Sequence, residues 1–267
     1  MRPVILLTDF GLEDHYVGVL HVVLHHWAAA AARIDLGHNV PAGDVWEACF
    51  QVRCAWPHLP SDAVVLAVVD PGVGGDRRPV AARVGDRWIV APDNGLAPAV
   101  GRIDEAVVLD WRRMGLAEPS STFHGRDLFA PAAARLARGD SAEDLGPEAP
   151  VESFIPCPLP DPAQTDTGLE GVILHIDRFG NLVTNIEAAT VPEDAELGFG
   201  AAGTASRVRT YGDAQEGEVV VLEGSSRLLE LAVKGGSAAS ATGLRRGDTV
   251  TVRNSEFGII GAGERSG

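Results

Sequence analysis

The stretches ILLTDFG (5–11) and AVVLAVVDPGVGG (63–75) decide the fold, because each joins a short apolar run to an aspartate and a glycine-containing turn. Continuous apolar runs of this length are typical of strands that are buried on both faces of a sheet. The glycines and the proline that follow mark the points where the chain leaves the sheet. We therefore predict that each stretch begins as a buried strand and places its aspartate, Asp9 or Asp70, at the strand's carboxyl end.

Helical patterns separate these strands from further short apolar runs, and this alternation is typical of a sheet covered by crossover helices. Capping aspartates favour the helix starts, and the WPHLP segment ends the second helix. The sequence thus predicts an α/β N-terminal domain over residues 1–150. Its predicted strands are 3–7, 33–36, 63–69, 79–84, 88–91 and 106–109, and its predicted helices begin at Asp14, Asp44 and Asp127 and end near Ala31, Pro57 and Arg138.

The second half of the chain has a different pattern. Residues 151–168 are rich in proline and have no periodic apolar pattern, which predicts an interdomain linker. Beyond it, short apolar runs alternate with glycine turns, and helical periodicity is scarce. We predict a mostly β, barrel-like C-terminal domain over 169–255, followed by a tail over 256–267. Its clearest predicted strands are 169–177, 218–222, 228–233 and 249–252.

The composition excludes several classes of partner. The chain of 267 residues has 37 acidic and 22 basic residues, a formal net charge of −15, which argues against binding to a nucleic-acid backbone. No segment approaches the ~20 apolar residues that cross a bilayer, and the N-terminus lacks a secretory signal pattern. The three cysteines, Cys49, Cys54 and Cys157, contain no CxxC pair. We expect a cytoplasmic protein with no membrane partner.

Asp9 and Asp70 are the first candidates for a functional site, because ligands of open α/β sheets gather at the carboxyl ends of strands. Arg77 lies on the same glycine-rich loop as Asp70, and His124 lies in STFHGRD just before a predicted helix. A carboxylate, a guanidinium and an imidazole brought together can exchange charge and protons at neutral pH. The alternatives stay open: either aspartate can cap its own turn, and the arginine and histidine can be surface and structural residues.

Two turns of the C-terminal domain carry further candidates. HIDRFGNLVTNI (175–186) places Asp177 and Asn181 around a Phe-Gly turn between two strands. An asparagine amide offers the donors and the acceptor that read the edge of a heterocycle such as adenine, although an ordinary hairpin turn is the alternative. EGSSRLLELAV places Ser225 and Ser226 at another turn, where hydroxyls can bind a carboxylate or only close the turn.

Several common motifs are missing. No G-x-G-x-x-G follows the first strand, and VVDPGVGGDRR lacks the lysine and hydroxyl of a Walker loop. His21 and His25 lie one helical turn apart, but no third ligand pattern accompanies them. We therefore expect neither a metal ion nor a cofactor, and the role of the histidine-rich segment 15–26 stays open.

Five motifs in one order give the chain its family resemblance. LLTDFG, VVDPGVG, APDNG, STFHGRDLFAP and IDRFGNLVTNI together resemble the S-adenosyl-L-methionine hydroxide adenosyltransferase family, which is related to the adenosyl fluorinase and chlorinase. The resemblance spans nearly the whole chain. It implies an enzyme without a cofactor that hydrolyses S-adenosyl-L-methionine to adenosine and methionine. It also implies a homotrimer whose active sites lie between the N-terminal domain of one subunit and the C-terminal domain of its neighbour.

The resemblance also implies roles for individual residues. Asp9 resembles the carboxylate that holds the ribose hydroxyls, and Asn181 is similar to the residue that reads adenine. Asp70, Arg77 and His124 look like the family's side-chain triad. Our hypothesis is that Asp70 and His124, tied together through Arg77, orient a water and remove its proton. Asp177, Ser225 and Ser226 resemble the family positions that hold the amino and carboxylate ends of methionine.

The related halogenases differ at the nucleophile pocket, where they have a tyrosine in YPATG and a serine in TFYS. The corresponding residues here are Asp70 in DPGVG and Gly125 in TFHG, and Val73 replaces the pocket threonine. The hydroxyl donors for a halide are missing, and a carboxylate repels an anion. We expect water as the nucleophile, in a water-poor pocket near Phe123 and Val73. The alternatives are a chlorinase-like transferase and a sensor that binds adenosine or S-adenosyl-L-methionine without turnover.

Overall fold

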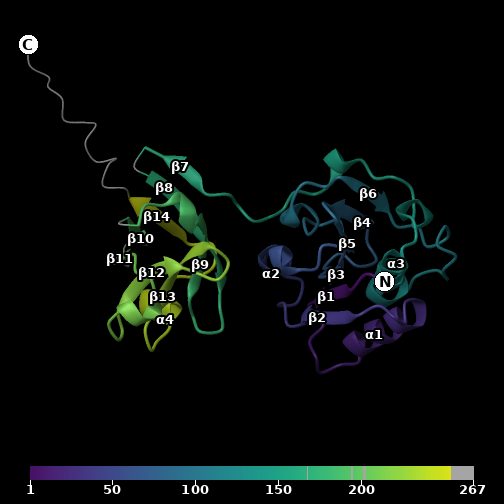
Figure 1. Cartoon of the computed structure of the whole chain (residues 1–267), viewed down its shortest axis with the longest axis horizontal. Helices are drawn as coiled ribbons and strands as arrows, with labels where there is room; N and C mark the ends of the chain where they lie inside the picture. The colour runs from purple at the N-terminus through teal and green to yellow at the C-terminus, as the bar shows by residue number, and fades with distance from the viewer. Residues whose placement is uncertain (167, 194, 201–202, 254–267) are drawn as a thin grey trace, which may run out of the picture. The chain divides into compact units, whose positions relative to one another are not determined.

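The computed structural model describes residues 1–253 except 167, 194 and 201–202. The chain divides into two compact units, Met1–Leu159 and Pro160–Gly267 (Figure 1). The tail predicted over 256–267 and the last two residues of the predicted β domain lie outside the described residues.

A six-stranded mixed sheet forms the centre of the first unit, in the order β2-β1-β3-β5-β4-β6. The strands β1, β2, β3 and β5 run parallel, whereas β4 is antiparallel to both of its neighbours. β1 and β3 are fully buried, as their unbroken apolar sequences predict. The strands are β1 (Val4–Thr8), β2 (Arg33–Gly37), β3 (Val64–Val68), β4 (Pro79–Val84), β5 (Arg87–Pro92) and β6 (Glu105–Val108).

Three helices cover this sheet: α1 (Tyr16–Trp27), α2 (Val45–Ala55) and α3 (Ala130–Arg138). α1 and α3 pack together in one core with Leu6 of β1 and Leu66 of β3. Figure 1 shows α2 on the opposite side of the sheet from α1 and α3. This arrangement confirms the α/β prediction for the N-terminal part of the chain.

The helix boundaries differ from the predicted ones in two places. α1 ends at Trp27, before the alanine run that was expected to continue it. The predicted helix from Asp127 begins instead as a π-helical turn, Gly125–Phe129, which leads into α3. Because Pro131 has no N–H, the chain can widen its turn just before that position without losing a donor.

The order of the strands creates a switch point beside β1. The chain passes from β1 through α1 to β2 on one side, and then crosses through α2 to β3 on the other side. Thr8 at the end of β1 is in register with Val68 at the end of β3. Asp9 and the Asp70 loop therefore leave the sheet next to each other, at the place where open α/β sheets bind their ligands.

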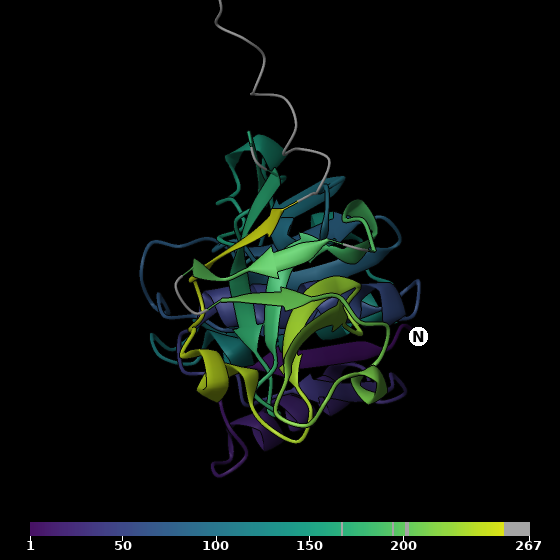
Figure 2. The ribbon, with the colours of Figure 1, turned by 90° about the vertical axis from the view of Figure 1, so that its left-hand side faces the viewer.

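An eight-stranded antiparallel sheet forms the second unit, in the order β11-β10-β14-β8-β9-β13-β12 with β7 paired to β8. Arg207, just after β11, forms a bridge with Val221 of β12, so the sheet nearly closes on itself (Figure 2). This confirms the barrel-like β prediction. The strands are β7 (Ala163–Thr165), β8 (Gly168–Ile176), β9 (Leu182–Glu187), β10 (Glu196–Gly198), β11 (Thr204–Ser206), β12 (Val219–Glu223), β13 (Leu228–Val233) and β14 (Thr249–Arg253).

Short elements complete the two units. The second unit contains one helix that the sequence did not predict, α4 (Ala238–Thr242), which Ser237 caps by accepting a hydrogen bond from the Ser240 N–H (3.1 Å). β7 lies inside the segment that the sequence predicts as a linker. Short 3₁₀ turns cover Trp56–His58, Pro98–Val100, Ala142–Asp144, Val151–Ser153, Ala188–Thr190 and Tyr211–Asp213. Among the described residues, no helix has the length and apolar character needed to span a bilayer.

Candidate active site

Asp9 lies directly after β1, with its carboxylate turned toward the loop that precedes α2. Its Oδ2 accepts a hydrogen bond from the Gly43 N–H (2.8 Å). Burial raises the pKa of Asp9, and the nearby charge of Asp70 adds to this rise. Two negative charges close together raise the free energy of the folded protein unless a positive charge or hydrogen bonds offset their repulsion. The ionisation of Asp9 therefore depends on the charge of Asp70.

Asp70 and Arg77 form a buried ion pair within one glycine-rich loop. Arg77 Nε donates to both carboxylate oxygens of Asp70 (2.9 and 3.0 Å), and Arg77 Nη2 donates to Oδ2. Only 6% of the Asp70 side chain and 10% of the Arg77 side chain are exposed. Arg77 also lies over the ring of Phe129, 5.4 Å from its centroid. Arg77 is therefore not the solvated surface charge that the sequence left as an alternative.

His124 completes this cluster from the start of the π-helical turn. Its Nδ1 lies 2.7 Å from Arg77 Nη2. Since a guanidinium can only donate, Nδ1 must be the acceptor, and the neutral ring carries its proton on Nε2. Burial lowers the pKa of His124, and the positive charge of Arg77 lowers it further. The imidazole is thus held neutral with its Nε2–H directed away from the arginine.

The neighbouring arginine has a separate role. Arg78 Nε donates to Asp93 Oδ2 (2.9 Å), and its Nη1 donates to Ser153 Oγ (2.8 Å). Asp93 also accepts from the Ile155 N–H (3.0 Å), so this pair holds the end of the first unit in place. The two consecutive arginines therefore form two similar ion pairs, of which only that of Arg77 reaches a histidine.

Aromatic side chains surround the residues next to His124. Phe10, Tyr16 and Phe123 contact one another with ring centroids 5.3 to 6.0 Å apart. A Cβ on Gly125 would lie 3.2 Å from Phe123 and 3.3 Å from Phe10, closer than side chains normally approach. Val73, the other residue of the predicted water-poor pocket, is 37% exposed in the single chain. A side chain at Gly125 thus requires Phe10 or Phe123 to move by a few tenths of an ångström.

This crowding gives a stability prediction. Gly125→Ser should lower the free energy of unfolding by about 1–3 kcal/mol, because the hydroxymethyl group overpacks the Phe10 and Phe123 contact. The matched control is Gly18→Ser in α1, where no heavy atom lies within 4 Å of an added Cβ. Urea unfolding of both variants measures the difference. Equally small changes in the free energy of unfolding at the two positions would show that Phe10 and Phe123 can move aside to accommodate the serine.

In the second unit, Asp177 and Asn181 close the turn between β8 and β9. Asp177 Oδ1 accepts from the backbone N–H groups of Phe179 (2.8 Å) and Asn181 (2.9 Å), and its Oδ2 accepts from Asn181 Nδ2 (3.0 Å). The turn-forming role that the sequence left open is therefore present. Both side chains can still form further hydrogen bonds, because the amide oxygen of Asn181 can accept and the carboxylate oxygens of Asp177 have several lone pairs.

The sequence reasoning missed two residues beside this turn, Tyr211 and Glu230. Asn181 Nδ2 lies 3.4 Å from the Tyr211 hydroxyl, which in turn donates to Glu230 Oε1. Burial raises the pKa of the Glu230 carboxyl and of the Tyr211 phenol. One sequence signal could have revealed this pair: Glu230 lies inside the apolar strand LLELAV, and a buried carboxylate requires hydrogen-bonding partners.

Ser225 and Ser226 lie on the turn between β12 and β13, as predicted. Ser225 is exposed and Ser226 is partly buried. A Cβ on Gly224 would come within 2.2 Å of Glu230 Oε2, so the buried carboxylate lies directly beneath the start of this turn. The structure thus groups the predicted site residues into two sets, one in each unit.

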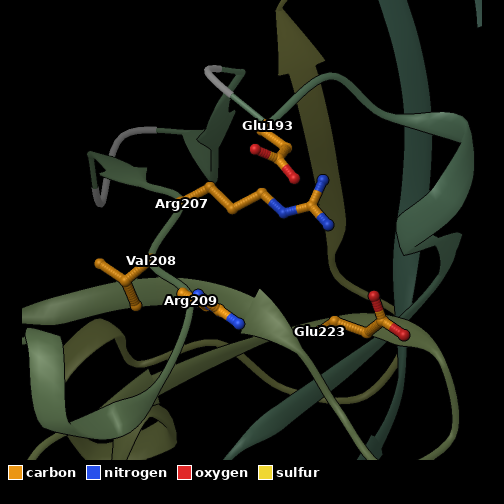
Figure 3. Close-up of a pocket in the computed structure, with 5 residues that line it drawn as sticks. All are labelled: Glu193, Arg207, Val208, Arg209 and Glu223. Atoms are coloured by element: carbon orange, nitrogen blue, oxygen red, sulfur yellow. The ribbon is translucent and has the colours of Figure 1, made fainter.

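A hollow of about 280 Å³ in the second unit contains none of these residues (Figure 3). It is lined by Glu193, Arg207, Val208, Arg209 and Glu223. Arg207 donates to the Val191 carbonyl (2.8 Å), so its guanidinium already supports the fold.

An open α/β sheet with a carboxylate–guanidinium–imidazole cluster at its switch point defines an enzyme with a small-molecule site. The comparison with family models narrows this class. Residues 4–146 match the S-adenosyl-L-methionine hydroxide adenosyltransferase N-terminal domain, and residues 171–251 match the C-terminal domain. The chain belongs to the S-adenosyl-L-methionine hydroxide adenosyltransferase family.

Individual relatives agree with this assignment. The chain is 47% identical over 259 residues to an (R)-S-adenosyl-L-methionine hydrolase of Thermus thermophilus, covering 92% of this chain and 98% of the relative. A fluorinase of an Actinoplanes species is 28% identical, with 94% and 97% covered. Among solved structures, a conserved hypothetical protein from Thermus thermophilus has a TM-score of 0.80 at 44% identity, and an uncharacterised conserved protein from Thermotoga maritima has 0.87 at 32%. Each comparison covers 94% of this chain and 100% of the other.

Proposed function

We propose that the protein hydrolyses S-adenosyl-L-methionine to adenosine and L-methionine by in-line attack of water on C5′. The observation that carries this proposal is the Asp70–Arg77–His124 cluster at the end of β3, in a chain of this family. One guanidinium holds a carboxylate and an imidazole together, so a donor and an acceptor for water are ordered before the substrate arrives. Three relatives at 39–47% identity that are named (R)-S-adenosyl-L-methionine hydrolases support the same reaction.

The nucleophile is the demanding part of this reaction. The oxygen of water forms a bond to C5′ while the bond from C5′ to sulfur breaks, and the sulfur keeps the electron pair and leaves as the neutral thioether of methionine. The leaving group therefore needs no proton. Because Arg77 occupies Nδ1 of His124, we assign its Nε2–H to positioning the water, and the remaining lone pairs of Asp70 to accepting the water's proton. Such help is worth about 10²–10⁴ in rate.

The other site residues are assigned to holding the substrate. Asp9 would bind the ribose hydroxyls, which keeps C5′ in line with the water. Asn181 would read adenine through the part of its amide that the turn leaves free. Asp177, Ser225 and Ser226 would hold the amino and carboxylate ends of methionine, and Phe123 would help to exclude bulk water.

The test of the reaction uses isotopically labelled water with chloride present. Incubation with S-adenosyl-L-methionine should give adenosine that carries the heavy oxygen on C5′, together with an equal amount of methionine, as measured by mass spectrometry. Formation of 5′-chloro-5′-deoxyadenosine would replace the proposal with the halide-using reaction. Substrate that persists with a stoichiometric amount of protein would instead indicate a binding protein.

We further propose a cytoplasmic homotrimer in which neighbouring subunits contribute the two residue sets to each site, as the family resemblance implies. Asp70→Asn and Asn181→Ala inactivate different sets, so neither variant alone should be active. When the two are unfolded together and reassembled, about a quarter of the interfacial sites should combine two intact sets and recover activity. Light scattering should give three times the chain mass of 28.0 kDa. No recovery in a mixed trimer would place both sets on one chain.

A further inference from the structure

A buried histidine outside the proposed active site directs one ring nitrogen toward an acidic side chain. His38 follows β2 and is 4% exposed. Its Nδ1 lies 2.9 Å from Thr8 Oγ1. Its Nε2 is buried and has no aligned hydrogen-bond partner among the residues that the structure describes. A buried ring nitrogen without a well-aligned hydrogen bond calls for an explanation, and a bound ligand is one.

Two further ligand-type side chains converge on this nitrogen. Asp35 of β2 has its Oδ1 3.1 Å from His38 Nε2 and 2.9 Å from His21 Nε2 of α1. One ligand atom from each of the three residues lies within 4.8 Å of the other two. This set was not predicted, because the sequence analysis considered His21 together with His25. In the structure His25 points elsewhere, with its Nδ1 3.4 Å from Arg33 Nη1.

We propose that His21, Asp35 and His38 form a binding site for a divalent transition-metal ion with the ligand preference of Zn²⁺. Two imidazole nitrogens and one carboxylate oxygen are a common set for this ion, which keeps its fourth position for water or another ligand. Tetrahedral bonds of about 2.0–2.2 Å separate neighbouring ligand atoms by roughly 3.3 Å. The two separations from Asp35 Oδ1, 2.9 and 3.1 Å, are slightly shorter, so a bound ion would lengthen each of these two by a few tenths of an ångström.

The surroundings of His38 are compatible with the tautomer that a metal ion requires. Thr8 Oγ1 accepts from the Phe10 N–H (3.3 Å), and a hydroxyl can accept a second hydrogen bond. If it accepts from His38 Nδ1–H, the lone pair of Nε2 faces Asp35 and His21. Metal-binding histidines usually donate their other ring nitrogen to an oxygen in this way.

The site also lies close to the proposed active site. Thr8 precedes Asp9, and the His38 carbonyl accepts from the Gly11 N–H (2.7 Å). A bound ion would join α1, β2 and the loop that leads to Gly43, the backbone partner of Asp9. We therefore expect the metal to stabilise the ribose-binding side of the site rather than to take part in the reaction.

The test measures metal binding directly on the untagged full chain, so its result does not depend on enzymatic activity. Equilibrium dialysis with Zn²⁺ should give one ion per chain, and Co²⁺ should give the intense visible absorption of a tetrahedral complex. Saturating Zn²⁺ should raise the Tm by about 3 °C. His21→Ala and Asp35→Asn should each weaken binding at least tenfold, and Thr8→Val by about 10–100-fold.

The matched control is His25→Ala, which removes an imidazole from the same exposed stretch of α1 without touching the cluster. It should bind Zn²⁺ as the unaltered chain does. Equal binding by the unaltered chain, His21→Ala and Asp35→Asn would overturn the proposal and indicate non-specific attraction to a chain with a net charge of −15. Absence of stoichiometric binding would overturn it as well. Circular dichroism establishes that each variant is folded.

Discussion

Replacing Asp70 by asparagine should lower kcat by about 10²–10⁴-fold while leaving the affinity for adenosine within about threefold. The amide keeps the size of the carboxylate but cannot accept the proton of the attacking water. It also leaves the buried Arg77 guanidinium without its counter-charge, so the imidazole that Arg77 holds becomes less well placed. Product chromatography gives the turnover, and calorimetry with adenosine gives the binding affinity.

Asp93→Asn is the matched control for this variant. Asp93 forms the neighbouring ion pair with Arg78, and its side chain is 3% exposed against 6% for Asp70, but its ion pair does not reach a histidine. Both variants should unfold at lower urea concentration, since each breaks a buried charge pair. Only Asp70→Asn should lose turnover per folded molecule. A similar loss of turnover in both variants, or a parallel loss of adenosine binding, would assign Asp70 to structure rather than to the reaction.

The elements that bury long apolar runs were predictable from the sequence. β1 and β3 lie within one residue of their predicted positions, because their almost entirely apolar sequences, VILLT and VVLAV, are typical of strands inside a covered sheet. The α2 cap was predictable for a local reason as well: Asp44 Oδ1 accepts from the Glu47 N–H (3.0 Å). The α/β pattern alone predicted that Asp9 and Asp70 lie at the carboxyl ends of strands, whereas the adjacency of those strands comes from the structure.

Features that depend on tertiary packing were not predictable. The π-helical turn at Gly125–Phe129 has no periodic signature, and α4 is only five residues long. β10 and β11 are three residues each, too short to show alternation. Glu230 contacts Tyr211, 19 positions away, and His38 contacts Thr8, 30 positions away, so the buried residue itself signals that a partner exists but not which one it is.

The same division applies to the candidate site. Motif order placed Arg77 and His124 in one set, and the structure brings them within hydrogen-bond distance although 47 positions separate them. What the motifs could not give is the direction of that hydrogen bond. A guanidinium that donates to Nδ1 fixes the tautomer of His124, and this changes its expected role from accepting the water's proton to orienting the water.

Arg77 should therefore control the pH at which the enzyme loses activity. Protonation of His124 at Nδ1 removes the acceptor for Arg77 and so displaces the imidazole that positions the water. Burial and the Arg77 charge both lower the pKa of His124 from its ordinary value of 6.5, so the acid limb of kcat/KM should lie below that pH. Arg77→Gln removes the positive charge and leaves the Asp70 carboxylate, which favours the imidazolium. Protonation then becomes easier, and the acid limb should move toward neutral pH, together with a loss of kcat of about 10²-fold or more.

Arg77→Lys separates the effect of charge from that of geometry. A lysine keeps the positive charge beside His124 but lacks the planar fork that contacts Asp70 and His124 at once. Its turnover should fall as that of the glutamine variant does, whereas its acid limb should stay close to that of the unaltered enzyme. The comparison requires pH–rate profiles of all three proteins at one ionic strength. An acid limb that stays in place in Arg77→Gln, or that moves equally in both variants, would mean that His124 is not the group whose protonation stops the reaction.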